Sequence, residues 1–179
     1  MTVTNRERLF VYLTAAWFAV LAGVDVLIFE SMADGQKAPD TQPFGYSFDS
    51  FAGWASALDA GERSAFVFWH SSILDFVFPL LLMAALYILI NAALRTFERF
   101  RTQPSWIRIA VPLALVAPYG LFDFLENGLV ADMLRGVVPI DQATVGLASS
   151  YTVLKFSFLV LAAAALGVFW LAARRAKSA

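Results

Sequence analysis

Residues 76–94, FVFPLLLMAALYILINAAL, contain no charged side chain. A helix of about 20 mostly apolar residues is long enough to cross the roughly 30 Å hydrocarbon core of a bilayer. Three other stretches have the same character, so the sequence predicts four transmembrane helices. Their expected bounds are residues 9–29, 66–94, 106–130 and 145–173.

The composition of the 179-residue chain indicates the same class of protein. Hydrophobic residues make up 60% of it and charged residues only 15%, whereas soluble domains have roughly 45–50% and about 25%. The chain has no cysteine and a single histidine, His70, which excludes thiol redox chemistry, iron–sulfur clusters and cysteine-ligated zinc. A net charge of −1 disfavours nucleic acid as a partner. We expect an all-α, polytopic membrane protein with a single domain over residues 1–179.

The distribution of basic residues predicts the orientation of the four-helix bundle. If four spans alternate in direction, one side of the membrane receives Arg6, Arg8, Arg95, Arg99, Arg101, Arg108, Arg174, Arg175 and Lys177. The opposite side has only Lys37, Arg63 and Arg135, among seven acidic residues. Because Lys and Arg are enriched in cytoplasmic segments, we expect both termini in the cytoplasm and the chain in the inner (plasma) membrane.

The long connection between the first two spans contains an amphipathic segment at about residues 47–60. Its apolar residues recur at helical spacing, and they are Phe48, Phe51, Trp54, Ala55 and Leu58. We expect Ser47 to cap the start of this helix and Gly61 to end it. An aromatic face of this kind suits either an interfacial anchor on the outer leaflet or a lid over a pocket that opens outward.

Polar residues lie near the outer end of every predicted span. A charged group at the bilayer centre costs roughly 2.5–3.5 kcal/mol, so each such group needs partners inside the bundle. In the predicted orientation all of them fall in one layer, and they are Asp25, His70, Asp75, Asp123, Glu126, Asn127, Tyr151 and Lys155.

Helical spacing predicts which members of this layer share a face. Asp123, Glu126 and Asn127 stand at i, i+3 and i+4, so they project from one side of their helix. His70 precedes Asp75 by five residues, a spacing that in an α-helix turns the two side chains in different directions.

The charges of the layer do not balance. Asp25, Asp75, Asp123 and Glu126 have one certain counter-charge, Lys155, and these carboxylates cannot all be ionised in a low dielectric. Either some are protonated, or a cation lies among them, or water enters from outside. In the simplest alternative, the polar groups only fix the register of the helices.

The functional hypothesis is a pocket for a mostly apolar molecule with a polar or cationic head: a lipid, sterol-like or isoprenoid molecule. A protonated acid beside an ionised one can move a proton between two carbons of such a molecule, so both an isomerase and a binding protein fit the sequence. The residues expected to do the chemistry are Asp75, Asp123 and Glu126. Those expected to hold the ligand are Asp25, His70, Asn127, Tyr151, Lys155, Trp69 and Tyr119.

Four spans, cytoplasmic termini and a long aromatic external loop together resemble the emopamil-binding-protein (EXPERA) superfamily. That family contains sterol isomerases and receptors for sterols or amines, and the resemblance implies that Asp25 and Asp75 line the ligand pocket. The string Asp123-Phe-Leu-Glu126-Asn127 and the residue Lys155 depart from the family's pattern. The string is instead similar to one in bacterial membrane proteins of unassigned function.

Two other classes of function remain open at this stage. A proton or metal site would use the same carboxylates, but the chain lacks the Glu-x-x-His pairs of di-iron bundles, and the spacing of His70 and Asp75 is awkward for one ion. We therefore predict no metal site and no cofactor. Alternatively, the chain is an accessory subunit whose acids meet a membrane-protein partner or a second copy of itself.

Overall fold

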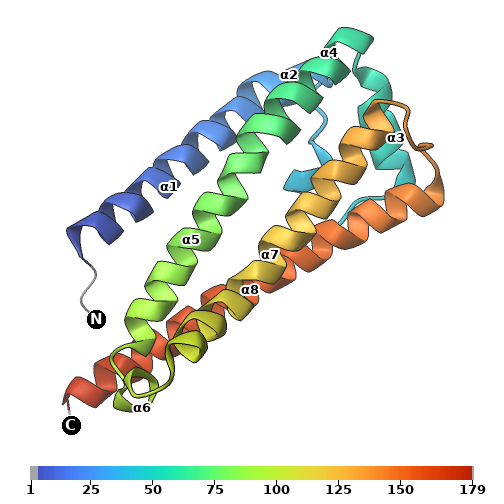
Figure 1. Cartoon of the computed structure of the whole chain (residues 1–179). Coiled ribbons are helices and arrows are strands. Elements are labelled where there is room, and N and C mark those ends of the chain that lie inside the picture. The colour runs from blue at the N-terminus through green and yellow to red at the C-terminus, as the bar shows by residue number, and fades with distance from the viewer. Residues whose placement is uncertain (1–3, 179) are drawn as a thin grey trace.

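The structure, a computed structural model, describes residues 4–178 and shows helices and no strand over that range. Four long helical rods dominate it (Figure 1), and each is long and apolar enough to cross a membrane. The first rod is α1 (Asn5–Val24), η1 (Asp25–Phe29) and α2 (Glu30–Met32), and the second is α4 (Ala60–Ala65), η3 (Phe66–Leu74) and α5 (Asp75–Leu94). The third and fourth are α7 (Ser105–Leu134) and α8 (Gln142–Ser178).

Each predicted span lies within one of these rods, so the prediction of an all-α chain with four membrane-length helices is confirmed. Three short elements connect the rods: η2 (Pro39–Thr41), α3 (Phe48–Ala57) and α6 (Glu98–Arg101). The start of α1, α6 and the end of α8 lie at one end of the bundle, and α3 and α4 lie at the other (Figure 1).

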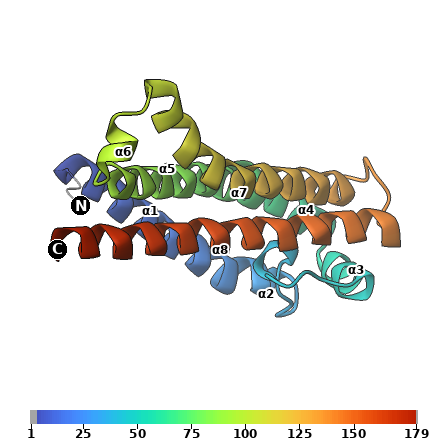
Figure 2. The same cartoon turned by 90° about the horizontal axis from the view of Figure 1, so that it is seen from below.

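The rods pack unequally. The closest pair is α7 and α8, α5 packs on both of them, and α1 packs mainly on α5. The indole Nε1 of Trp17 donates a hydrogen bond to the Leu74 carbonyl (3.2 Å) and so ties α1 to the second rod. Figure 2 shows α8 running the length of the bundle, with α5 and α7 on one side of it and α2 and α3 on the other.

Two segments, η1 and η3, are π-helical. Their hydrogen bonds span five residues, so the Glu30 N–H reaches the Asp25 carbonyl and the Asp75 N–H reaches the His70 carbonyl. Residues five apart therefore share a face, and His70 and Asp75 lie on the same side of their rod. The expectation that they point in different directions was wrong because it assumed α-helical geometry. π-Helical turns are rare and occur frequently at functional sites.

The segment at about residues 47–60, expected to form one helix, contributes to two. Ser47 caps α3 as expected, since its side chain accepts a hydrogen bond from the Ser50 N–H. Gly61 does not end this helix: Leu58 is extended, Asp59 starts α4 with a capping box to Glu62, and Gly61 lies inside α4.

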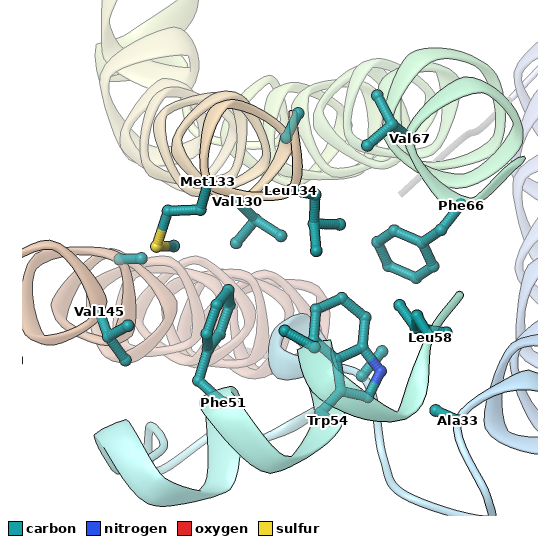
Figure 3. Close-up of a cluster of buried hydrophobic side chains, with 14 of the residues drawn as sticks. Ala33, Phe51, Trp54, Leu58, Phe66, Val67, Val130, Met133, Leu134 and Val145 are labelled. Carbon is teal, nitrogen blue, oxygen red and sulfur yellow. The ribbon is translucent and has the colours of Figure 1, made fainter. Parts of the chain in front are cut away.

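The aromatic face of α3 is buried in the protein itself. Phe51 and Trp54 are only 1% and 2% exposed, and they pack on residues from the ends of α7 and α8 such as Met133 and Val145 (Figure 3). The face expected to meet the membrane interface thus holds the external segment against the bundle.

A turn at Gly45 fixes the segment that precedes α3. Gly45 has a φ of +82°, and a Cβ placed there would lie 2.6 Å from Ser149 Oγ and 3.1 Å from Val153 Cγ2. The next residue, Tyr46, donates its N–H to Ser149 Oγ at 2.8 Å. Only glycine adopts this conformation freely and also leaves room for the close approach of α8.

We expect Gly45→Ala to lower the free energy of unfolding by at least about 1–2 kcal/mol, the cost of a left-handed conformation for a residue with a Cβ. Thermal unfolding of the purified chain in mild detergent measures the effect. Gly146→Ala is the matched control, because a Cβ there meets nothing within 4 Å and alanine is the better helix former. Equal unfolding midpoints for the two variants would contradict the role of the Gly45 turn.

Candidate functional site

The centre of the candidate site is a buried ion pair network between α7 and α8, which we call the lysine group. Lys155 Nζ lies 3.0 Å from Asp123 Oδ1 and 2.8 Å from Glu126 Oε2. The other oxygen of Glu126 accepts a short hydrogen bond from the Thr152 hydroxyl. Asp123 and Glu126 are one turn apart on α7, and Thr152 and Lys155 are one turn apart on α8, so two faces at i, i+3 spacing meet.

Asn127 links the lysine group to the second rod. Its Nδ2 donates hydrogen bonds to Asp75 Oδ2 at 2.6 Å and to Asp123 Oδ2 at 3.2 Å. Asn127 is 7% exposed and Asp75 is 4% exposed, so water has little access to them. The Asn127 amide therefore supplies the hydrogen-bond donors that the Asp75 and Asp123 carboxylates need. Asp123, Glu126 and Asn127 share one face of α7, as predicted, and this face contacts both α8 and α5.

A second cluster surrounds the only histidine, and we call it the histidine group. His70 Nε2 lies 3.1 Å from Asp25 Oδ1 and 3.4 Å from Asp40 Oδ2. The imidazole is 1% exposed, stacks on Phe66 with ring centroids 4.4 Å apart, and meets the ring of Phe29 at 79°. Aromatic packing thus fixes the ring, while neither ring nitrogen makes a hydrogen bond.

Asp40 is the member of the site that sequence reasoning missed. It belongs to the loop between the first two rods, where Gly and Pro interrupt every periodic pattern, so no spacing rule places it near a helix. In the structure the short helix η2 begins at the buried Pro39 and brings the Asp40 carboxylate to His70. Its side chain is only 12% exposed, and this burial raises the pKa of Asp40, although the nearby His70 opposes the rise.

The two clusters together contain more acids than bases. The carboxyl groups are those of Asp25, Asp40, Asp75, Asp123 and Glu126, and the side chains that can be cationic are His70 and Lys155. The excess of carboxyl groups is larger than the sequence indicated, because Asp40 adds one. The site therefore favours a proton, a metal ion or a cationic ligand group.

A cleft of about 710 Å³ opens beside these clusters, between α1 on one side and α5, α7 and α8 on the other. Its polar end contains Asp25, Asp40, Asp75, Asp123 and Lys155. The remainder is lined mainly by apolar side chains, among them Val11, Ala15, Phe18, Leu21, Leu82, Ala85, Leu86, Leu89 and Leu159. One continuous space thus joins a charged end to a long apolar end.

The structure brings most of the predicted site residues together. Asp25, Asp75, Tyr119, Asp123 and Lys155 line the cleft. His70, Glu126 and Asn127 are buried directly behind these residues.

Two of the predicted aromatic residues do not join the site. Trp69 is 55% exposed and packs edge-on against Phe68, and Tyr151 packs against Phe122. Neither of them lines the cleft. The abundance of aromatic residues in the spans gave no information about which face each one occupies.

We expect Lys155→Met to destabilise the fold by about 3–5 kcal/mol, because the change leaves two buried carboxylates without their cation. The measurement is the unfolding midpoint in detergent. Lys37→Met, the same change at an exposed lysine, is the control and should leave the midpoint almost unchanged. A Lys155→Met chain as stable as the parent would show that the pairing with Asp123 and Glu126 does not hold the bundle together.

Comparisons of this chain with protein-family models, with curated proteins and with solved structures give no match. The case for a function therefore rests on the geometry of the cleft and of the two charged clusters.

Proposed function

We propose that this chain is a multi-pass membrane protein that binds an amphipathic molecule, such as a lipid, a sterol-like compound or an isoprenoid, in the cleft. The observation that carries the proposal is the graded polarity of a single cavity, which has carboxylates and a lysine at one end and leucine, alanine and phenylalanine side chains along the rest. Its volume of about 710 Å³ suits one such molecule, since ligand pockets typically measure about 300–1,000 Å³.

The two ends of the cleft would contribute differently to binding. A hydrocarbon chain along α1 and α5 would be held mainly by van der Waals packing, because the lipid that it leaves is as apolar as the walls of the cleft. At the polar end, Asp75, Asp123 and Lys155 offer both acceptors and a donor to a hydroxyl or amine head. Preorganised charges of this kind orient a ligand and exclude molecules that lack the head group.

The orientation that we propose follows the basic residues. The termini and α6 face the cytoplasm, and α3 and α4 face the outside, which places both charged clusters in the outer half of the membrane. The cleft then offers its polar end to the outer leaflet and its apolar end to the middle of the bilayer, as an inserted lipid requires.

Double-bond isomerisation is the reaction that this arrangement would support. One carboxyl of the pair Asp75 and Asp123, which Asn127 links, would give a proton to one carbon of the double bond, and the other would remove a proton from a different carbon, so the double bond shifts. Glu126 would act through Lys155, which it contacts. The layout resemblance to the emopamil-binding-protein superfamily supports this hypothesis, because it implies ligand-facing positions for Asp25 and Asp75.

The alternative role as an accessory subunit has less support. It needs acids on a surface that a partner can reach, but Asp75, Asp123 and Glu126 are at most 4% exposed. Their burial favours a ligand inside the bundle over a partner outside it.

The proposal predicts that a bulky residue in the apolar end displaces the ligand. Ala15 on α1 is exposed and lines the cleft, while its neighbour Ala16 is exposed and does not. We expect native mass spectrometry of the wild-type chain, released from mild detergent, to show one retained amphipathic molecule. That mass should persist in Ala16→Trp and disappear in Ala15→Trp. Retention by both variants, or a wild-type chain that carries nothing, would contradict the proposed function.

Substitutions of acids that belong to the two charged clusters should reduce ligand retention more than a substitution of an acid outside them. We expect Asp123→Ala and Glu126→Ala to reduce retention of the molecule, or turnover of it, more than Glu30→Ala does. Glu30 is half-buried at the rim and belongs to neither cluster. The same spectra give the retained fraction, and equal losses in the three variants would count against the clusters as the binding site.

A further inference from the structure

The histidine group and the neighbouring Asp75 have the geometry of a metal site. One ligand atom from each of Asp40, His70 and Asp75 lies within 4.8 Å of the other two. Asp40 comes from η2, and His70 and Asp75 come from consecutive parts of the second rod, η3 and α5, so a loop and a rod converge. Asp25, at the start of η1, adds a third acid, 3.1 Å from His70 Nε2.

The distances around the imidazole match those between ligands of one ion. Metal–ligand distances of 2.0–2.2 Å place neighbouring ligand atoms about 3.0 to 3.4 Å apart in octahedral or tetrahedral coordination. His70 Nε2 lies 3.1 Å from Asp25 Oδ1 and 3.4 Å from Asp40 Oδ2. It makes a hydrogen bond to neither oxygen, although both are within reach.

Several buried polar atoms of this group lack a hydrogen-bond partner. They are both ring nitrogens of His70, Oδ1 of Asp25 and Oδ1 of Asp40. A buried polar atom without a partner costs about 1–3 kcal/mol, so an added ligand on the Nε2 edge of His70, where the Asp25 and Asp40 carboxylates also lie, stabilises this group. Nδ1 lies on the opposite edge of the ring and does not bind the same ion. A cation satisfies the imidazole nitrogen and the carboxylate oxygens at the same time.

The remaining charges do not remove this need. Lys155 is held by Asp123 and Glu126 on the other side of the site, which leaves Asp25, Asp40 and Asp75 with His70 alone. Asn127 donates to one oxygen of Asp75, a contact that orients the carboxylate without adding positive charge. Groups that orient metal ligands in this way are typical of protein metal sites.

We propose that Asp40, His70 and Asp75, assisted by Asp25, bind one divalent first-row transition-metal ion such as Mn²⁺, Fe²⁺ or Zn²⁺. One imidazole with several carboxylates suits these ions, whereas Mg²⁺ and Ca²⁺ prefer oxygen ligands alone. The π-helix η3 makes the site possible, because it places His70 and Asp75 on one face. The inference goes beyond the proposed function and does not depend on it.

The test uses Mn²⁺ and the full chain in mild detergent, first stripped with a chelator. Titration with MnCl₂, followed by electron paramagnetic resonance of the free ion, should show one Mn²⁺ bound per chain. Pulsed measurements on the bound ion should show coupling to an imidazole nitrogen. We expect His70→Gln and Asp75→Asn to weaken binding by at least about tenfold, since even groups that only orient a ligand contribute that much.

Asp34→Asn is the matched control and should bind Mn²⁺ like the wild type. Asp34 is an exposed acid of the same external loop, and its φ of +52° is one that asparagine tolerates well. A wild-type chain that binds no Mn²⁺, or one whose bound Mn²⁺ shows no nitrogen coupling, would overturn the site even if the variants fail to fold. Native mass spectrometry of the chelator-stripped protein shows separately whether the amphipathic molecule is retained. A failure of the metal site is therefore distinguishable from a failure of the proposed ligand binding.

Discussion

The helices of this apolar bundle pack around five carboxyl groups, which need hydrogen-bond donors and counter-charges from neighbouring helices. Buried carboxyl groups need hydrogen-bond partners, so the helices supply donors and counter-charges to one another. Lys155 on α8 holds Asp123 and Glu126 of α7, and Asn127 connects α7 to Asp75 at the start of α5. The three helices that pack most closely are the ones that these contacts join.

The remaining acids are brought in by departures from regular helix geometry. The π-helical turn of η3 aligns His70 with Asp75, η1 starts at Asp25, and η2 carries Asp40 into the bundle from an external loop. The aromatic face of α3 fastens that loop region to α7 and α8 (Figure 3). The π-helices η1 and η3 and the loop that contains η2 thus form the polar end of the cleft, and regular α-helices form its apolar walls.

The sequence predicts the four rods and much of the candidate site. The residues that it does not place correctly were missed for physical reasons. Long apolar runs define the four rods, and the i, i+3, i+4 spacing of Asp123, Glu126 and Asn127 places these side chains on one face, as observed. The alignment of His70 with Asp75 was missed because hydrophobic patterns do not reveal a π-helix. Asp40 was missed because an irregular loop has no period. Trp69 was misplaced because an aromatic residue suits a lipid-facing surface and a pocket equally well.

In the proposed complex, α1 stands away from α7 and α8, and an amphipathic molecule lies between them with its head at the acids. An experimental density map of the chain, determined in a lipid bilayer disc without detergent, tests it most directly. The account predicts elongated density along α1 and α5 that ends within hydrogen-bonding distance of Asp75, Asp123 or Lys155. A map in which α1 packs directly on α8 and closes the cleft would contradict it.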